Sequence, residues 1–141
     1  MKRILFILVF LIIPLKGFAL IEVDITRGNL NPLPIAVSPL SIDEKSKKSF
    51  EKIINKKNIG EEISKVVESN LKTSGLFNPL NKDAFLQAPD IANLKPRFED
   101  WNLIKAQALI TGKVNFVDEK LRVEFRLWDV LAGKEMMALA F

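Results

Sequence analysis

The chain contains no cysteine and no histidine. The absence of cysteine excludes thiolate metal sites and Cys-His nucleophiles, and it means that the fold is stabilised without disulfides. The absence of histidine excludes Ser-His-Asp triads and imidazole metal sites as well. Any enzymatic activity would therefore use carboxylates or lysines, and the residues predict neither a metal nor a cofactor.

The carboxylates and lysines do not form a catalytic pattern. Eight of the 17 acidic residues occur as sequence neighbours, whose side chains point in different directions, whereas an acid/base pair converges on one bond from separate elements. These neighbours are Asp43-Glu44, Glu61-Glu62, Glu99-Asp100 and Asp118-Glu119. Two Ser-x-x-Lys matches, at Ser49 and Ser69, lack the Ser-Asp-Asn and Lys-Thr-Gly partners of a penicillin-binding serine site. We therefore predict no catalytic residue and no enzyme.

The sequence has one long apolar run, from Ile4 to Leu15, which is shorter than the about 20 residues of a transmembrane helix. Charged residues precede this run, and the small residues Gly17 and Ala19 follow it. A charged start, a short apolar run and small residues are the three parts of a secretory signal peptide. We expect residues 1–19 to be a signal peptide cleaved after Ala19, which leaves no stable membrane span; an uncleaved anchor is the alternative.

Removal of this leader changes the charge of the protein. Lys2, Arg3 and Lys16 leave with it, so the 21 basic residues become 18 against 17 acidic residues, and the net charge falls from +4 to +1. A near-neutral domain has no general attraction for nucleic acid, so no nucleic-acid partner is predicted. The chain is 48% hydrophobic and 27% charged, and we expect residues 20–141 to form one globular domain.

A lysine-rich stretch is the local exception to this neutrality. Residues 44–58 contain six lysines and two glutamates, with Phe50 as their one aromatic residue. Proteins that bind single-stranded nucleic acid usually interleave several aromatic residues with the basic ones. We expect a solvated linker or short helix, and the alternative is a patch for anionic lipid or an acidic partner.

Two helices are predicted. The first runs from Asn58 to Gly75, where Asn58 and Glu61 have capping-box spacing and Gly75 stands at the position of a C′ glycine. Its apolar stripe comprises Ile59, Ile63, Val66, Val67 and Leu71. Its expected i,i+4 ion pairs are Glu61–Lys65 and Glu68–Lys72. The second helix covers residues 97–106, with Trp101 as a core residue rather than a ligand platform.

The remaining periodicity is that of strands. Apolar and polar residues alternate at the start of the domain, and a loop over residues 27–34 follows because a glycine and two prolines interrupt any ladder. The last third reads as a hairpin with a turn at residues 118–120, a second turn at Gly133 and a third strand. The expected strands lie at residues 21–26, 35–40, 108–116, 121–127 and 134–141.

Four segments form a recognisable series along the chain. They are residues 25–37 (ITRGNLNPLPIAV), 74–80 (SGLFNPL) with Phe85, 98–114 (FEDWNLIKAQALITGKV) and 123–136 (VEFRLWDVLAGKEM). The positions that carry the pattern are Gly28, Pro34, Ile35, Ser74, Gly75, Phe77, Trp101, Gly112, Phe125, Arg126, Asp129 and Val130. In this order the segments resemble the N-terminal domain of the TolB family, the periplasmic proteins of the Tol-Pal system.

The chain also departs from that family. The lysine-rich stretch at about residues 41–58 is longer than the family's usual link between strand and helix, and we expect an extended surface loop there. We expect the family's next helix and its β-propeller to be absent, because the sequence stops after the last expected strand and has no internal repeat of about 40 residues, the length of a propeller blade. Contact with the peptidoglycan-associated lipoprotein Pal is therefore not expected.

The resemblance implies an α/β fold of the α+β type, with a mixed sheet of about five strands, helices packed on one face, and the family's last helix missing. It also implies a non-enzymatic periplasmic domain for protein-protein contacts. The family's mature N-terminal segment contacts the C-terminal domain of TolA, and it maps here to Leu20, Ile21, Glu22, Val23, Asp24, Ile25 and Thr26. This segment would bind by β-augmentation; alternatively, residues 21–26 are strand one of the domain's own sheet.

The resulting hypothesis is an exported TolB-like interaction domain that contributes to envelope integrity, cell division and protein import. One alternative is a truncated gene product, because the missing helix would leave one sheet face bare around Phe125, Met137 and Phe141. Another is a small periplasmic hydrolase that uses lysine or carboxylates. A buried lysine that meets two carboxylates in one pocket would support the hydrolase.

Overall fold

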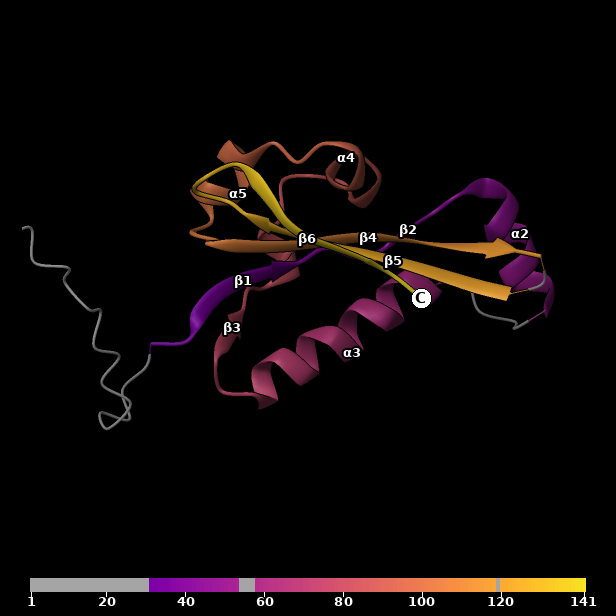
Figure 1. Cartoon of the computed structure of the whole chain (residues 1–141), viewed down its shortest axis with the longest axis horizontal. Helices are drawn as coiled ribbons and strands as arrows, with labels where there is room; N and C mark the ends of the chain where they lie inside the picture. Colours follow the sequence, from indigo (N-terminus) through magenta and orange to yellow (C-terminus); the bar gives the residue numbers. More distant parts are fainter. Residues whose placement is uncertain (1–30, 54–57, 119) are drawn as a thin grey trace, which may run out of the picture.

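The computed structural model describes residues 31–53, 58–118 and 120–141 (Figure 1). Its elements, in chain order, are β1 (Leu33–Val37), β2 (Ser41–Ile42), α2 (Glu44–Ile53), α3 (Ile59–Thr73), β3 (Phe77–Pro79), η1 (Lys82–Ala84), α4 (Pro89–Leu94), α5 (Phe98–Leu103), β4 (Ala108–Val117), β5 (Lys120–Asp129) and β6 (Lys134–Ala140). The predicted signal peptide, its cleavage point and the strand at residues 21–26 lie outside the described residues.

The strands form one mixed sheet in the order β3-β1-β4-β5-β6, and β2 also pairs with β4. β1 is parallel to both β3 and β4, and the three long strands β4, β5 and β6 form an antiparallel meander. The expected fold class, a mixed sheet with helices, is confirmed. The sheet has six strands rather than about five, because the short strands β2 and β3 carry too little alternation to be seen in the sequence.

The helices lie on both faces of the sheet, not on one face as expected. α4 and α5 cover one face and α3 covers the other (Figure 1). The central strand β4 explains this arrangement, because Leu109 packs against Trp101 of α5 while Val114 packs with Phe50 and Ile63 on the opposite face. Successive side chains of a strand point to opposite faces, so a strand that is apolar at both parities needs cover on both sides.

Trp101 is the centre of the core between the sheet and α5. Its side chain is 1% exposed, and the Phe85 ring meets it edge-on at a centroid distance of 5.0 Å. The indole Nε1 donates a hydrogen bond of 2.8 Å to Oε1 of Gln87. The prediction of a core tryptophan is therefore confirmed, although α5 is shorter than the expected helix. It ends at Leu103 because the chain turns through Lys105, whose φ is 63°.

α3 packs on the sheet through part of the predicted apolar stripe together with two small residues, since Ile59 and Ile63 pack against the core. Gly60 and Ser64 are buried, whereas Val66 is 60% exposed. The backbone N–H of Leu40 donates to the Gly60 carbonyl at 3.2 Å, so the first turn of α3 lies directly against the chain after β1. A larger side chain on this line would hold the helix away from the sheet.

The ends of α3 match the prediction only in part. Gly75 has the positive φ of 73° expected for a C′ glycine, but the Asn58 side chain makes no capping hydrogen bond. The Glu61–Lys65 pair is present at 2.7 Å. Glu68 instead pairs with Lys82 at 3.1 Å, because η1 folds back beside the helix and brings a lysine from another element.

Within the lysine-rich stretch, α2 is the short helix that was one of the two forms expected there, and β2 and α2 together replace the expected extended surface loop. Phe50 anchors α2, since its side chain is 1% exposed and its ring meets Phe116 edge-on at 5.8 Å. The Ser46 hydroxyl accepts a hydrogen bond of 2.8 Å from the Phe116 N–H. One apolar and one polar contact with β4 are therefore enough to order a segment whose composition is that of a linker.

The start of β1 also differs from the sequence-based expectation. Leu33 and Pro34 were expected in a loop, but they pair with Phe77 and Asn78 of β3. The Pro34 carbonyl accepts a hydrogen bond from Gln107 at 3.0 Å. Proline lacks an N–H but keeps its carbonyl, so it still serves as an acceptor at the first residues of a strand.

Candidate interaction surface

The predicted partner-binding segment, Leu20–Thr26, lies outside the described residues, as does Ala19. The hollows of the described surface include an apolar groove on the sheet and a polar cleft between helix ends.

The apolar groove lies on the α3 side of the sheet, where β5 and β6 extend beyond the helix. Its volume is about 240 Å³, and it is lined by Val67, Ile110, Phe125, Arg126, Leu127, Met137 and Leu139. Met137 is 50% exposed, Leu139 is 49% exposed and Phe141 is 74% exposed. The expectation of a bare sheet face around Phe125, Met137 and Phe141 is confirmed for the described residues.

The strand register places these apolar side chains in one row of pairs. Phe125 is opposite Leu139, and Leu127 is opposite Met137, so all four point to the same face. The rings of Phe125 and Phe141 lie 6.5 Å apart at an angle of 68°. Contiguous exposed apolar side chains of this kind are typical of a surface that another polypeptide covers.

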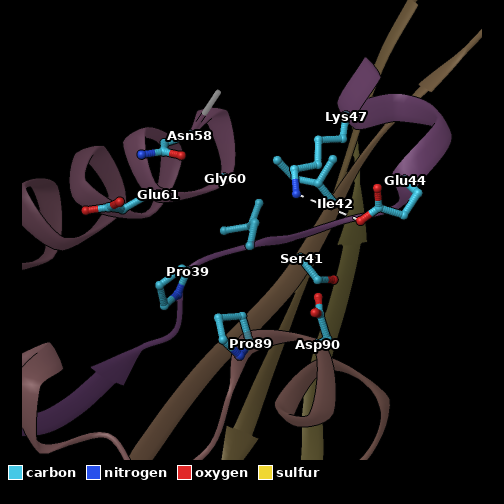
Figure 2. A pocket seen from close by; sticks show the side chains of 11 residues that line it. Pro39, Ser41, Ile42, Glu44, Lys47, Asn58, Gly60, Glu61, Pro89 and Asp90 are labelled. Carbon is cyan, nitrogen blue, oxygen red and sulfur yellow. Dashed lines mark ion pairs between the residues drawn. The ribbon is translucent and has the colours of Figure 1, made fainter. Parts of the chain in front are cut away.

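The polar cleft lies beside β2, at the first residues of α2, α3 and α4 (Figure 2). Its volume is about 270 Å³, and its lining includes Glu44, Lys47, Glu61 and Asp90. Two of its carboxylates already have basic partners, because Glu44 lies 3.8 Å from Lys47 and Glu61 lies 2.7 Å from Lys65. The hydrogen bond from Lys65 lowers the pKa of Glu61, which stays ionised and paired.

The described contacts do not assemble the site that a hydrolase would need. Lys82 lies 3.1 Å from the Ser64 hydroxyl and 3.1 Å from one carboxylate, that of Glu68. Ser64 is 0% exposed, so no substrate reaches its hydroxyl, which donates to the Glu61 carbonyl at 2.8 Å. This cluster joins α3 to η1 and is explained by that structural role.

Two further properties concern the described part of the chain. Within these ranges, no group of three or more acidic side chains is placed to hold a metal ion. None of the helices described is both long and apolar enough to cross a bilayer.

Comparison with solved structures supports the fold. TolB from Acinetobacter baumannii matches 78% of this chain and 23% of its own, with 18% identity and a TM-score of 0.54. The LpoB C-terminal domain from Salmonella enterica matches 81% of this chain and 84% of its own, with 12% identity and a TM-score of 0.53. Lipoprotein GNA1162 from Neisseria meningitidis matches 78% of each chain, with 17% identity and a TM-score of 0.54. At these identities the likeness concerns the fold alone.

Sequence comparison is more specific. The chain is 81% identical over 139 residues to the Tol-Pal system protein TolB of Pelagibacter ubique (strain HTCC1062). This match covers 99% of the chain but 31% of the relative, so the chain spans about a third of that protein's length. The family model of the TolB amino-terminal domain matches residues 21–136. The chain therefore belongs to the TolB family and corresponds to its amino-terminal domain.

Proposed function

We propose that this chain is a periplasmic, non-enzymatic interaction domain that works in the Tol-Pal system. The observation that carries the proposal is the match of residues 21–136 to the TolB amino-terminal domain, together with 81% identity to a Tol-Pal system protein. The apolar groove is consistent with a domain that works through protein contacts. Its contribution would be to envelope integrity, cell division and protein import.

The proposed partner is the C-terminal domain of TolA, and the proposed contact is the segment Leu20–Thr26. Ile21, Val23 and Ile25 alternate with polar residues, so an extended segment would present one apolar row to a partner sheet. Backbone hydrogen bonds along the segment would supply affinity, and pockets for the alternate side chains would supply specificity.

The test is the affinity of the chain for a TolA C-terminal domain before and after deletion of residues 20–26. We expect the deletion to abolish binding. A matched pair of variants then distinguishes the contribution of the apolar side chains from that of the polar ones. Substitution of Ile21, Val23 and Ile25 by serine should weaken binding strongly, because it removes the apolar row. Serine at Glu22 and Asp24 should change binding little. Unchanged affinity after the deletion would refute the assignment, whatever the effect of the substitutions.

A second candidate follows from the exposed groove. In this case the domain works only as part of a longer TolB protein, in which further polypeptide covers the apolar face of β5 and β6. We then expect the isolated chain to aggregate, and a version extended with the helix that follows this strand in TolB proteins to be soluble. Analytical ultracentrifugation of both proteins distinguishes the cases, since a stable monomer of the isolated chain would contradict this candidate.

A further inference from the structure

α2 presents three lysines along one line of its surface. Lys45, Lys48 and Lys52 follow one another at intervals of three and four residues, which places their side chains in a single row on a helix of about 3.6 residues per turn. All three are exposed. The row is about 10 Å long at a rise of about 1.5 Å per residue. We call these three residues the lysine stripe.

Neighbouring carboxylates compensate the charge of the lysine stripe only in small part. In the described ranges of the chain none of its three side chains forms an ion pair. Lys47, on the neighbouring line of the helix, lies 3.8 Å from Glu44 (Figure 2). Asp43 attracts Lys45, but both of its carboxylate oxygens accept hydrogen bonds from Ser46. The positive charges of the stripe are therefore available to a partner.

These lysines also oppose the local structure in which they lie. Lys45–Lys48 and Lys48–Lys52 are like-charge pairs at spacings i,i+3 and i,i+4, which destabilise a helix. Lys45 lies in the first turn, where the positive end of the helix disfavours a cation. α2 forms because Phe50 and Ser46 attach it to β4. Residues that break a local rule are expected at functional sites, so the stripe is a candidate interaction surface.

The attraction that the stripe exerts is local. Without the predicted leader the chain has 18 basic and 17 acidic residues, and without the three stripe lysines it would have 15 and 17, so the net charge would change from +1 to −2. The stripe thus carries more positive charge than the domain as a whole. Because the domain is nearly neutral and salt screens charges beyond about 10 Å, a partner must contact the stripe directly.

We propose that the lysine stripe binds an acidic helix of another protein. Carboxylates three and four residues apart on such a helix form a row of the same length, so each lysine can meet one of them. Glu44 and Glu51 are exposed on the neighbouring line of α2, where a broad anionic surface would meet them together with the lysines. A narrow partner that follows the stripe avoids this repulsion.

A bilayer is a less suitable partner for α2 than a helix. Helices that lie on membranes insert an apolar face and carry their basic residues on the other face. The Phe50 side chain is 1% exposed and packs against Phe116, so this ring is not free to enter lipid. The described side chains of α2 therefore supply charge for a partner but no apolar anchor for a membrane.

Binding of two synthetic helical peptides to the full chain tests the proposal. The first peptide carries three glutamates in one row, at the spacing of the stripe, and the second has the same composition with the glutamates spread around the helix. We expect the first to bind about fivefold more tightly at low ionic strength, because exposed ion pairs contribute little singly and three act together. Nuclear magnetic resonance titration measures both affinities. Equal affinities would overturn the proposal.

A matched pair of variants locates the contact. The stripe variant replaces all three lysines by glutamine (K45Q/K48Q/K52Q) and should lose the preference for the first peptide. The control variant removes the same charge from exposed lysines elsewhere on the surface (K72Q/K95Q/K134Q) and should keep the preference. Equal loss in both variants would show that net charge alone is responsible and would overturn the proposal.

A vesicle assay distinguishes a lipid surface from an acidic helix. We expect the full chain and the stripe variant to bind equally weakly to vesicles of phosphatidylglycerol and phosphatidylethanolamine, because α2 offers no free apolar face. Vesicle binding that the stripe variant loses would assign the stripe to lipid and would overturn the proposal.

Urea denaturation separates a binding role from a structural one. We expect the urea midpoint of the stripe variant to equal or exceed that of the parent chain, because two like-charge pairs are removed. A lower midpoint would show that the lysines stabilise α2 and would overturn the proposal. None of these measurements includes TolA, and every variant keeps the segment Leu20–Thr26. Failure of the TolA contact and failure of the lysine stripe are therefore separate results.

Discussion

At the scale of single residues, Gly60 fixes the position of α3. A Cβ atom at this position would overlap the carbonyl oxygen of Leu40, which is backbone and cannot move aside as a side chain would. The Leu40 N–H donates a hydrogen bond to the Gly60 carbonyl. This bond holds the two backbone segments together, so the Leu40 carbonyl oxygen stays close to Gly60. The glycine is therefore required by close packing and not by its own backbone angle.

We expect Gly60→Ala to lower the free energy of unfolding by about 1–3 kcal/mol, the usual cost of forcing extra volume into a packed contact. Gly75→Ala is the matched control, because Gly75 has a φ of 73° but open space around the added atom. It should cost about 1 kcal/mol from backbone strain alone. Urea denaturation measures both, and a smaller loss for Gly60→Ala than for Gly75→Ala would show that the contact is not tight.

At the scale of elements, α2 depends on a few side chains that attach it to β4. The Asp43 carboxylate accepts hydrogen bonds of 2.8 Å from the N–H and from the hydroxyl of Ser46, and that hydroxyl in turn holds the Phe116 N–H. These bonds favour the ionised carboxylate. The backbone N–H of Ser46 is the main cause that lowers the pKa of Asp43 below its usual value of 3.8.

A lowered pKa in the folded state predicts how stability changes with pH. The contribution of Asp43 is present above pH 3.8 and is lost as the pH falls through its folded-state pKa, because the unfolded chain then binds the proton more readily. Asparagine still caps a helix but does not titrate. We therefore expect the Asp43→Asn variant to lose less unfolding free energy than the parent chain when the pH is lowered. Urea midpoints at pH 6 and pH 3 measure the difference. An identical pH dependence in the variant would contradict this role.

At the scale of the whole molecule, the sheet is covered unequally. α3 covers β1 and β4 on one face, while Met137, Leu139 and Phe141 remain about half or more exposed. The β5–β6 half of that face is thus the apolar part of the described surface best suited to contact with another polypeptide, whether a partner or further TolB sequence.

We expect the double substitution Met137→Lys and Leu139→Lys to reduce self-association and the fluorescence of a hydrophobic dye. The free energy of unfolding should change by only about 0.5 kcal/mol, because both side chains are already about half exposed to water. Val66→Lys is the control, since Val66 is 60% exposed on α3 but does not line the groove. Equal effects from the control would show that added charge, and not the groove, is responsible.

Features that depend on neighbouring residues could be predicted from the amino-acid sequence alone. The alternation in β4 and β5 gave the hairpin, the position of Gly75 gave the end of α3, and the spacing around Trp101 gave a core residue. Three other features depend on the folded arrangement: Glu68 pairs with Lys82, Phe50 attaches α2 to Phe116 of β4, and helices cover both faces of the sheet. These outcomes depend on contacts between residues far apart in the chain. Local periodicity shows which side chains need burial, but the arrangement of the other elements determines what buries them.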